Sequence, residues 1–166
     1  MKIKKIIIVF LVIIITFNLY EKFFTKSLSI KEVEKFAIQH KLNTIGVKKI
    51  GNKTLIFYER EKGLGSYELI KKFGKVHQVG WTKFQNNPVI VYGEYDEIEK
   101  EQSYFGAIIT DTSILKRGDE LIVTDINGKK ITKKITPNEK VYLIKNVNEI
   151  EDYEIQDINN KVIFPY

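Results

Sequence analysis

The sequence predicts a mainly β protein of the α+β class. In it, an N-terminal transmembrane helix and a short amphipathic helix precede an antiparallel sheet, sandwich or partly open barrel. Three features indicate this class: a continuous apolar run after the first lysines, one helix-capping pattern, and strand-like segments separated by turn residues. We expect residues 1–26 to be a membrane anchor or uncleaved signal, and residues 27–166 to be a single extracytoplasmic β-rich domain.

The N-terminal segment has the pattern of a signal anchor. Residues 1–5 are basic, and the apolar residues 6–24 would span about 28 Å as a helix, close to the ~30 Å hydrocarbon layer of a bilayer. A cleavable signal peptide also needs small residues in an A-x-A-like pattern, which residues 16–26 lack. We expect an uncut anchor that binds the lipid bilayer through residues 6–24; a cleaved, secreted form is the alternative.

Charge around this run predicts its orientation. Lysines crowd the residues before the run, whereas the lysines just after it are accompanied by Glu21. Positively charged flanks stay in the cytoplasm. We therefore expect a single-pass protein of the cell membrane with a cytoplasmic N-terminus and an extracytoplasmic C-terminal domain.

A capping box predicts the first helix of the domain. Ser29 and Glu32 have the spacing at which each side chain binds the other residue's backbone amide. Val33 and Phe36 then recur at helical spacing, and the helix should run to about Lys41. We expect this amphipathic helix to cover one face or edge of the sheet.

Alternating apolar residues and turn signals predict strands after the helix. Strands are expected at residues 45–50, 54–59, 76–81, 89–95, 104–110, 120–126, 129–135, 141–145, 153–157 and 162–164. Residues 60–65 read as a polar turn, residues 66–73 fit either a helix or a strand, and residues 111–118 read as a connection. Gly93 suggests a bulge.

Asn127-Gly128 is the clearest turn signal, because this dipeptide favours a two-residue type I′ hairpin. Such a turn would place Asp125 opposite Lys130 and the acidic strand opposite the basic one. The lysines of residues 129–134 are therefore interpreted as a paired sheet face and not as a binding patch.

Charge and composition argue against several classes of function. Of the net charge of +6, residues 1–26 carry +4, from five lysines and one glutamate, which leaves +2 for the domain. Only Arg60 and Arg117 are arginines, so nucleic-acid binding is not expected. The absence of cysteine excludes disulfides, thiolate nucleophiles and cysteine-ligated zinc.

No catalytic, cofactor or metal motif is found. His40 and His77 lie in no H-x-x-x-H or H-E-x-x-H context, so neither is expected to bind zinc. The acidic residues 94–101 lack the glycine of a calcium loop, and Gly63-Leu64-Gly65 lacks the rest of a dinucleotide loop. We expect no catalytic residue, no cofactor and no metal.

Aromatic residues gather in the middle of the chain. In an exported domain they could line a groove for a peptide or a glycan, or they could pack in the core. The candidate binding residues are Trp81, Phe84, Tyr92 and Tyr95.

The middle of the chain, about residues 54–135, carries a recognisable order of motifs: residues 54–58 (TLIFY), 67–73, Gly80-Trp81, residues 88–93 (PVIVYG), Asp96, Ile98, residues 107–109 and Asn127-Gly128. In this order it resembles small secreted or membrane-anchored proteins of Bacillus-like Firmicutes. The motifs themselves are packing and turn motifs. The resemblance implies location and a β-rich fold, and no functional residue carries over.

Together these features predict a membrane-tethered extracytoplasmic binding module without enzymatic activity, which contacts a protein or an envelope polymer. A cell-envelope hydrolase, and an accessory or immunity-type subunit of a membrane complex, are the alternatives.

Overall fold

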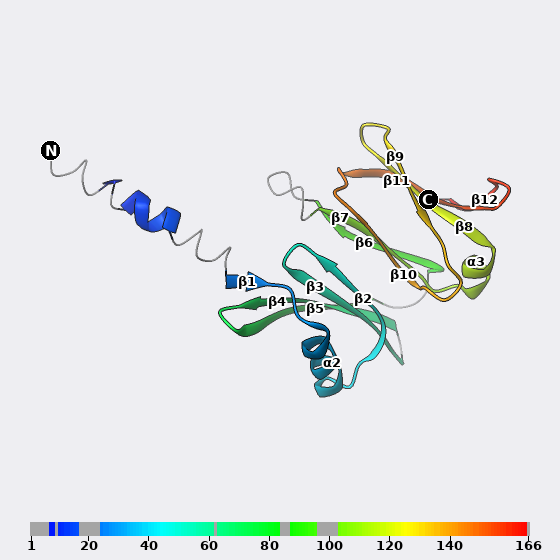
Figure 1. The fold of residues 1–166 in the computed structure, drawn as a ribbon. Coiled ribbons are helices and arrows are strands. Elements are labelled where there is room, and N and C mark those ends of the chain that lie inside the picture. The colour runs from blue at the N-terminus through cyan, green and yellow to red at the C-terminus, as the bar shows by residue number, and fades with distance from the viewer. Residues whose placement is uncertain are drawn as a thin grey trace.

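The computed structural model describes residues 7–8, 10–16, 24–61, 63–83, 87–95 and 103–165. These residues form three antiparallel sheets, of five, three and four strands, which we call sheets 1, 2 and 3 (Figure 1). The prediction of a mainly β, antiparallel fold is confirmed. Helix α2 and sheets 1, 2 and 3 lie in that order as successive layers.

Sheet 1 is a meander with a short additional strand. Its strands are β1 (Thr25–Lys26), β2 (Asn43–Ile50), β3 (Lys53–Arg60), β4 (Gly63–Lys72) and β5 (Lys75–Lys83). Strands β2 to β5 pair in chain order, and β1 pairs with the last two residues of β4. The hairpin predicted around Gly51-Asn52 is confirmed as β2–β3.

Helix α2 (Ile30–Gln39) covers the outer face of sheet 1 (Figure 1). The predicted capping box is present: the backbone N–H of Ser29 donates to Glu32 Oε2 at 2.8 Å. Val33 and Phe36 pack with Ile56 and Leu69 of the sheet. The helix prediction is thus confirmed, because capping and apolar spacing are both local properties of the chain.

Sheet 2 is buried on both faces. It contains β6 (Val89–Glu94), β7 (Tyr104–Ile109) and β10 (Val141–Lys145), in the order β10-β7-β6. Successive side chains of β7 alternate between two cores: Ile108 packs towards sheet 1, and Phe105 and Ala107 pack towards sheet 3. This explains why residues 104–109 (YFGAII) form a continuous apolar run instead of an alternating one.

Sheet 3 closes the other side of this core and curves with sheet 2 like half of a barrel. Its strands are β8 (Gly118–Asp125), β9 (Lys130–Lys134), β11 (Ile150–Asp157) and β12 (Val162–Pro165), in the order β12-β11-β8-β9. Helix α3 (Thr112–Arg117) links β7 to β8.

Several local predictions are wrong or are decided by the structure. Residues 66–73, which fitted either a helix or a strand, lie mostly in β4, because the strand pairs on both sides with β3 and β5. The polar turn at 60–65 is shorter than predicted. The connection at 111–118 contains α3, whose start is capped by the Asp111 carboxylate, which accepts from the Ser113 N–H at 2.7 Å. Gly93 marks no bulge, since the β6–β7 register is continuous.

The β8–β9 hairpin is offset by one residue from the prediction. Of the two turn residues only Gly128 has a positive φ, of 74°, and its N–H donates to the Asp125 carbonyl at 2.8 Å. This geometry is a type I turn followed by a left-handed glycine, which needs a three-residue loop. Thr124, not Asp125, therefore pairs with Lys130. The acidic strand still faces the basic one, as the Glu120–Lys134 pair shows.

The prediction of an N-terminal transmembrane helix is not supported by the described residues. Residues 10–16 are helical, whereas most of the remaining residues of the predicted 6–24 span lie outside the described residues. Within the described part of the chain, no helix combines the length and hydropathy needed to cross a bilayer.

Replacing Ile108 with alanine should lower the free energy of unfolding by about 2–5 kcal/mol, because this fully buried side chain lies between sheets 1 and 2. Urea unfolding of the full chain in mild detergent measures the effect. The control is Val79→Ala, at a position that is 71% exposed, with an expected change below about 1 kcal/mol. Equal losses would contradict the central position of sheet 2.

Candidate functional site

An apolar groove opens where β6 ends and β7 begins. Its volume is about 310 Å³, and the connection between β10 and β11 forms its opposite wall. The residues that line it are Val91, Tyr92, Gly93, Glu94, Tyr95, Tyr104, Phe105, Val147, Asn148, Glu149 and Ile150. We refer to this site as the aromatic groove. It has an apolar interior with carboxylates among its lining residues.

Tyr92 is one of the lining residues, and its ring packs on the sheet 1 side of sheet 2. Its hydroxyl donates to the Tyr142 carbonyl at 3.3 Å, and its ring lies 4.8 Å from the Phe57 ring, centroid to centroid. The ring crosses the backbone of Gly106, where a Cβ would lie 2.0 Å from a ring carbon. Burial, and then the nearby Tyr104, raise the pKa of Tyr92 above its usual range. The side chain is therefore held neutral and in one place.

A buried lysine connects the groove to sheet 1. Lys53 Nζ lies 2.5 Å from Glu94 Oε2 and 3.4 Å from Glu68 Oε1. Burial lowers the pKa of Lys53, but the hydrogen bond to Glu94 and the charges of both carboxylates outweigh burial and raise it above the ordinary 10.5. Lys53 therefore stays charged and orients Glu94 at the groove.

Tyr104 lies beside these charges. Burial, followed by the carboxylates of Glu68 and Glu94, raises the pKa of Tyr104 to about 12. Its ring centroid is 6.1 Å from that of Tyr92. The two phenols are thus neutral at physiological pH, and both pack towards sheet 1, on the face of sheet 2 opposite to Phe105.

One aspartate positions the opposite wall. Asp125 Oδ2 accepts from Asn148 Nδ2 at 2.8 Å, while Oδ1 accepts from the backbone N–H groups of Asn127 and Lys129. The hydrogen bond from Asn148 has the largest effect on the pKa of Asp125 and lowers it. Burial raises this pKa by less, and the two backbone donors lower it further. The same carboxylate therefore holds both the β8–β9 turn and the residues that enclose the groove.

Two of the four aromatic residues predicted from the sequence line this groove, namely Tyr92 and Tyr95. Trp81 belongs to β5 and pairs with Ser66, and Phe84 lies outside the described residues. The sequence analysis missed the wall at residues 147–150, because this segment carries no motif. Its position beside the ends of β6 and β7 depends on the pairing of β11 with β8.

The two histidines lie in different parts of sheet 1 and its helix. His40 ends α2 and stacks on Phe36 at 4.2 Å between ring centroids, whereas His77 pairs with Ile70 in β5. Among the residues that the structure describes, no three His, Asp or Glu side chains are grouped as metal ligands.

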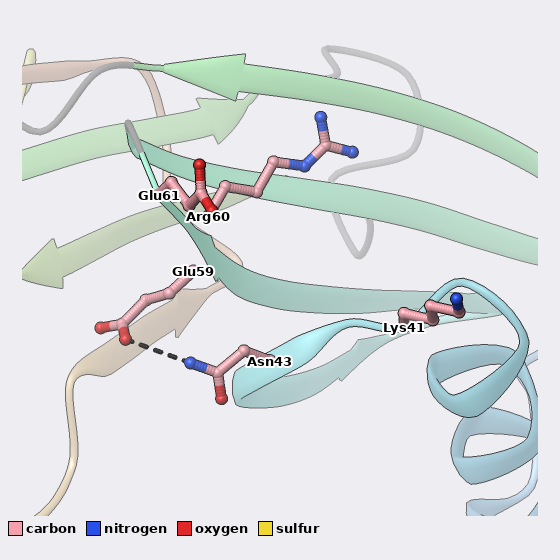
Figure 2. A pocket seen from close by; sticks show the side chains of 5 residues that line it. All are labelled: Lys41, Asn43, Glu59, Arg60 and Glu61. Carbon is pink, nitrogen blue, oxygen red and sulfur yellow. Dashed lines mark hydrogen bonds between the residues drawn. The ribbon is translucent and has the colours of Figure 1, made fainter.

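A second, polar hollow of about 680 Å³ lies at the end of β3, and Figure 2 shows its side chains. It is lined by Lys41, Asn43, Glu59, Arg60 and Glu61. Glu59 is engaged within the protein: Oε1 lies 2.7 Å from Lys140 Nζ, and Oε2 accepts from Asn43 Nδ2 at 3.4 Å. The aromatic groove is the stronger candidate, because it combines an apolar interior with positioned polar groups.

Comparisons of the chain with protein-family models, curated proteins and solved structures found no match.

A double-mutant cycle tests the link between Lys53 and Glu94. The variants Lys53→Met, Glu94→Gln and their combination should give a coupling of about 0.5–1.5 kcal/mol at pH 7. Because folding raises the pKa of Lys53, this contribution is complete below the pKa of the unfolded chain and is lost as pH rises through the folded value, above 10.5. Unfolding measured at several pH values between neutral and alkaline checks both statements.

The control cycle uses the more exposed pair of Lys134 and Asp119, whose coupling should stay below about 0.5 kcal/mol. A Lys53–Glu94 coupling as small as that of the control pair would show that Lys53 does not position Glu94.

Proposed function

We propose that this protein is a membrane-tethered extracytoplasmic binding module whose aromatic groove receives a short apolar segment of a partner protein, with a basic residue beside it. The single observation that carries the proposal is the groove itself, in which Val91, Phe105, Val147 and Ile150 form an apolar interior and Glu94 and Glu149 are among the lining residues.

The size of the groove favours a segment of a larger partner. Its volume of about 310 Å³ lies at the lower end of ligand pockets, which hold about 300–1,000 Å³. It has room for a few side chains. Aliphatic walls from Val91, Val147 and Ile150 suit apolar side chains better than the hydroxyl groups of a sugar.

Charge at the edge of the groove supports a basic neighbour in the partner segment. Glu149 is exposed, and Tyr95 beside it is 40% exposed. Carboxylates next to aromatic rings attract ammonium and guanidinium groups through charge and through the ring faces. The tyrosine-rich lining is also typical of sites that bind proteins.

The N-terminal segment supports tethering in the membrane. In the described residues 10–16 every side chain is exposed, and the apolar ones range from 43% for Ile14 to 65% for Phe10. A contiguous apolar surface of this kind marks contact with lipid or protein. With the lysines before it, this supports an anchor whose N-terminus stays in the cytoplasm.

No observation among the described residues favours the envelope-hydrolase alternative. Of the two carboxylates among the lining residues, Glu94 and Glu149, Glu94 faces the ammonium group of Lys53. An acid–base pair for hydrolysis would need two carboxyl groups that face a bound substrate.

Site-specific photocrosslinking tests the groove. A benzoylphenylalanine in place of Tyr95, in intact cells, should crosslink to a discrete protein that protease digests. The control is the same group in place of Ile158, an exposed residue outside the groove. A product removed only by wall-degrading enzymes would identify a glycan ligand and contradict the proposed protein partner.

Charge reversal in the same crosslinking strain tests the basic neighbour. Glu149→Lys should reduce the yield of the Tyr95-position crosslink about tenfold, equivalent to ~1.4 kcal/mol. Glu151→Lys makes the same change at an exposed position that does not line the groove and should leave the yield unchanged. An equal effect of both variants would show that the charge acts only at long range.

Labelling of single cysteines tests the topology, because the chain contains no cysteine of its own. Ile158→Cys should react with a membrane-impermeant maleimide on intact cells and stay with the membrane fraction. Lys4→Cys should react only after lysis. The opposite pattern, or a freely soluble protein, would refute the proposed tether and location.

A further inference from the structure

The turn between β4 and β5 places an exposed phenylalanine in an unfavourable backbone conformation. Phe73 has φ 49° and Gly74 has φ 77°, so both turn residues lie in the left-handed region, as in a type I′ turn. Asn, Asp or Gly are the residues that fit the first of these positions, whereas a bulky side chain there costs about 1–2 kcal/mol. Phe73 is nevertheless present, and 50% of it is exposed.

Phe24 lies next to Phe73 at the same tip. The two rings are stacked with their centroids 6.1 Å apart, and Phe24 is 46% exposed. Together they present an aromatic surface at the end of the hairpin. Each ring leaves about half of its surface in water.

Strand β1 fixes this tip beside the N-terminal segment. Thr25 pairs with Lys72 and Lys26 pairs with Lys71. The chain that comes from the apolar segment therefore enters the domain directly at the β4–β5 hairpin, as Figure 1 shows. If the segment is anchored in a bilayer, the tip lies close to the bilayer surface.

Basic residues surround the two rings. Lys26 and Lys75 are exposed and Lys72 is partly exposed. Beside the tip, a hollow of about 380 Å³ is lined by Lys26, Lys49 and Lys71, together with Glu32. The carboxylate of Glu32 is bonded to Lys71 and Ser29. Lysines around exposed aromatic rings are the composition of surfaces that bind anionic membranes.

We propose that the β4–β5 hairpin tip docks on an anionic lipid surface, with Phe24 and Phe73 at the level of the headgroups and Lys26 and Lys75 against the phosphates. This inference rests on the proposed tether, which brings the tip to the membrane. The docked tip adds a second contact with the bilayer, which gives the domain a fixed orientation on the membrane surface.

The depth of spin labels in the bilayer tests this docking. The full chain, with one cysteine introduced at a time, is reconstituted in phosphatidylglycerol vesicles, and accessibility to oxygen and to a nickel complex reports the depth of each label. Labels at Lys75→Cys and Val76→Cys, beside the tip, should both lie at the headgroup level; Val76 is 43% exposed. Labels at Leu11→Cys should lie in the hydrocarbon layer, and at Asn127→Cys, in the β8–β9 turn, in water.

The outcomes separate this inference from the proposed tether. A Leu11 label in water would refute the tether and, with it, the docking. A Leu11 label in lipid combined with Lys75 and Val76 labels in water would overturn the docking alone. The tip labels should move towards water in phosphatidylcholine vesicles or high salt, because both weaken the lysine–phosphate attraction. Unchanged depth would refute the role of the lysines.

Phe73→Asn provides a variant that should fold at least as well as the natural chain. Asparagine tolerates a positive φ, so the free energy of unfolding should not fall. The Lys75 label should nevertheless move from the headgroup level into water in this variant. Retention of the label at the headgroup level would overturn the role of Phe73, and a loss of stability would show that its ring serves the fold.

Discussion

The burial of sheet 2 on both of its faces is the constraint on which the rest of this structure depends. Every residue of β7 is buried, and its side chains alternate between a core shared with sheet 1 and a core shared with sheet 3. Because each side of the strand is packed, β7 cannot shift by one residue without exchanging the two cores. The strand therefore fixes the positions of all three sheets.

The aromatic groove is a consequence of this arrangement. It opens at the end of sheet 2 where Tyr104 begins β7 and Glu94 ends β6. Lys53 connects that end to sheet 1, and Asp125 connects the opposite wall to sheet 3 through Asn148. Each wall is thus held by a charged group that is bonded to a different layer, which gives a partner a prepared surface instead of a mobile one.

The proposed roles divide the domain between two contacts. The β4–β5 tip, with Phe24 and Phe73, belongs to the same end of sheet 1 as the entry of the N-terminal segment. The groove lies at the junction of the other two sheets. A domain held to the bilayer at two points and open at a separate groove can present that groove in a defined orientation, which reduces the entropy lost on binding.

The sequence by itself determined the features that local chemistry encodes. The capping box at Ser29, the strand periodicity and the mainly β class follow from residues that are close together in the chain, and the structure confirms them. Tyr92 and Tyr95 could also be identified, as aromatic residues at the end of a predicted strand. The sequence could not decide between helix and strand for residues 66–73, because their strand conformation depends on pairing with β3 and β5 on both sides.

Only the tertiary structure decided where these elements meet. Lys53 and Glu94 are 41 residues apart, and Asp125 and Asn148 are 23 apart, so no sequence motif joins them. The Asp125 carboxylate closes the β8–β9 turn through Oδ1 and is also bonded to Asn148 of the groove wall through Oδ2, a link that no local pattern predicts. The groove arises from packing between layers, and the free energy that selects such packing belongs to the whole fold and not to any one segment.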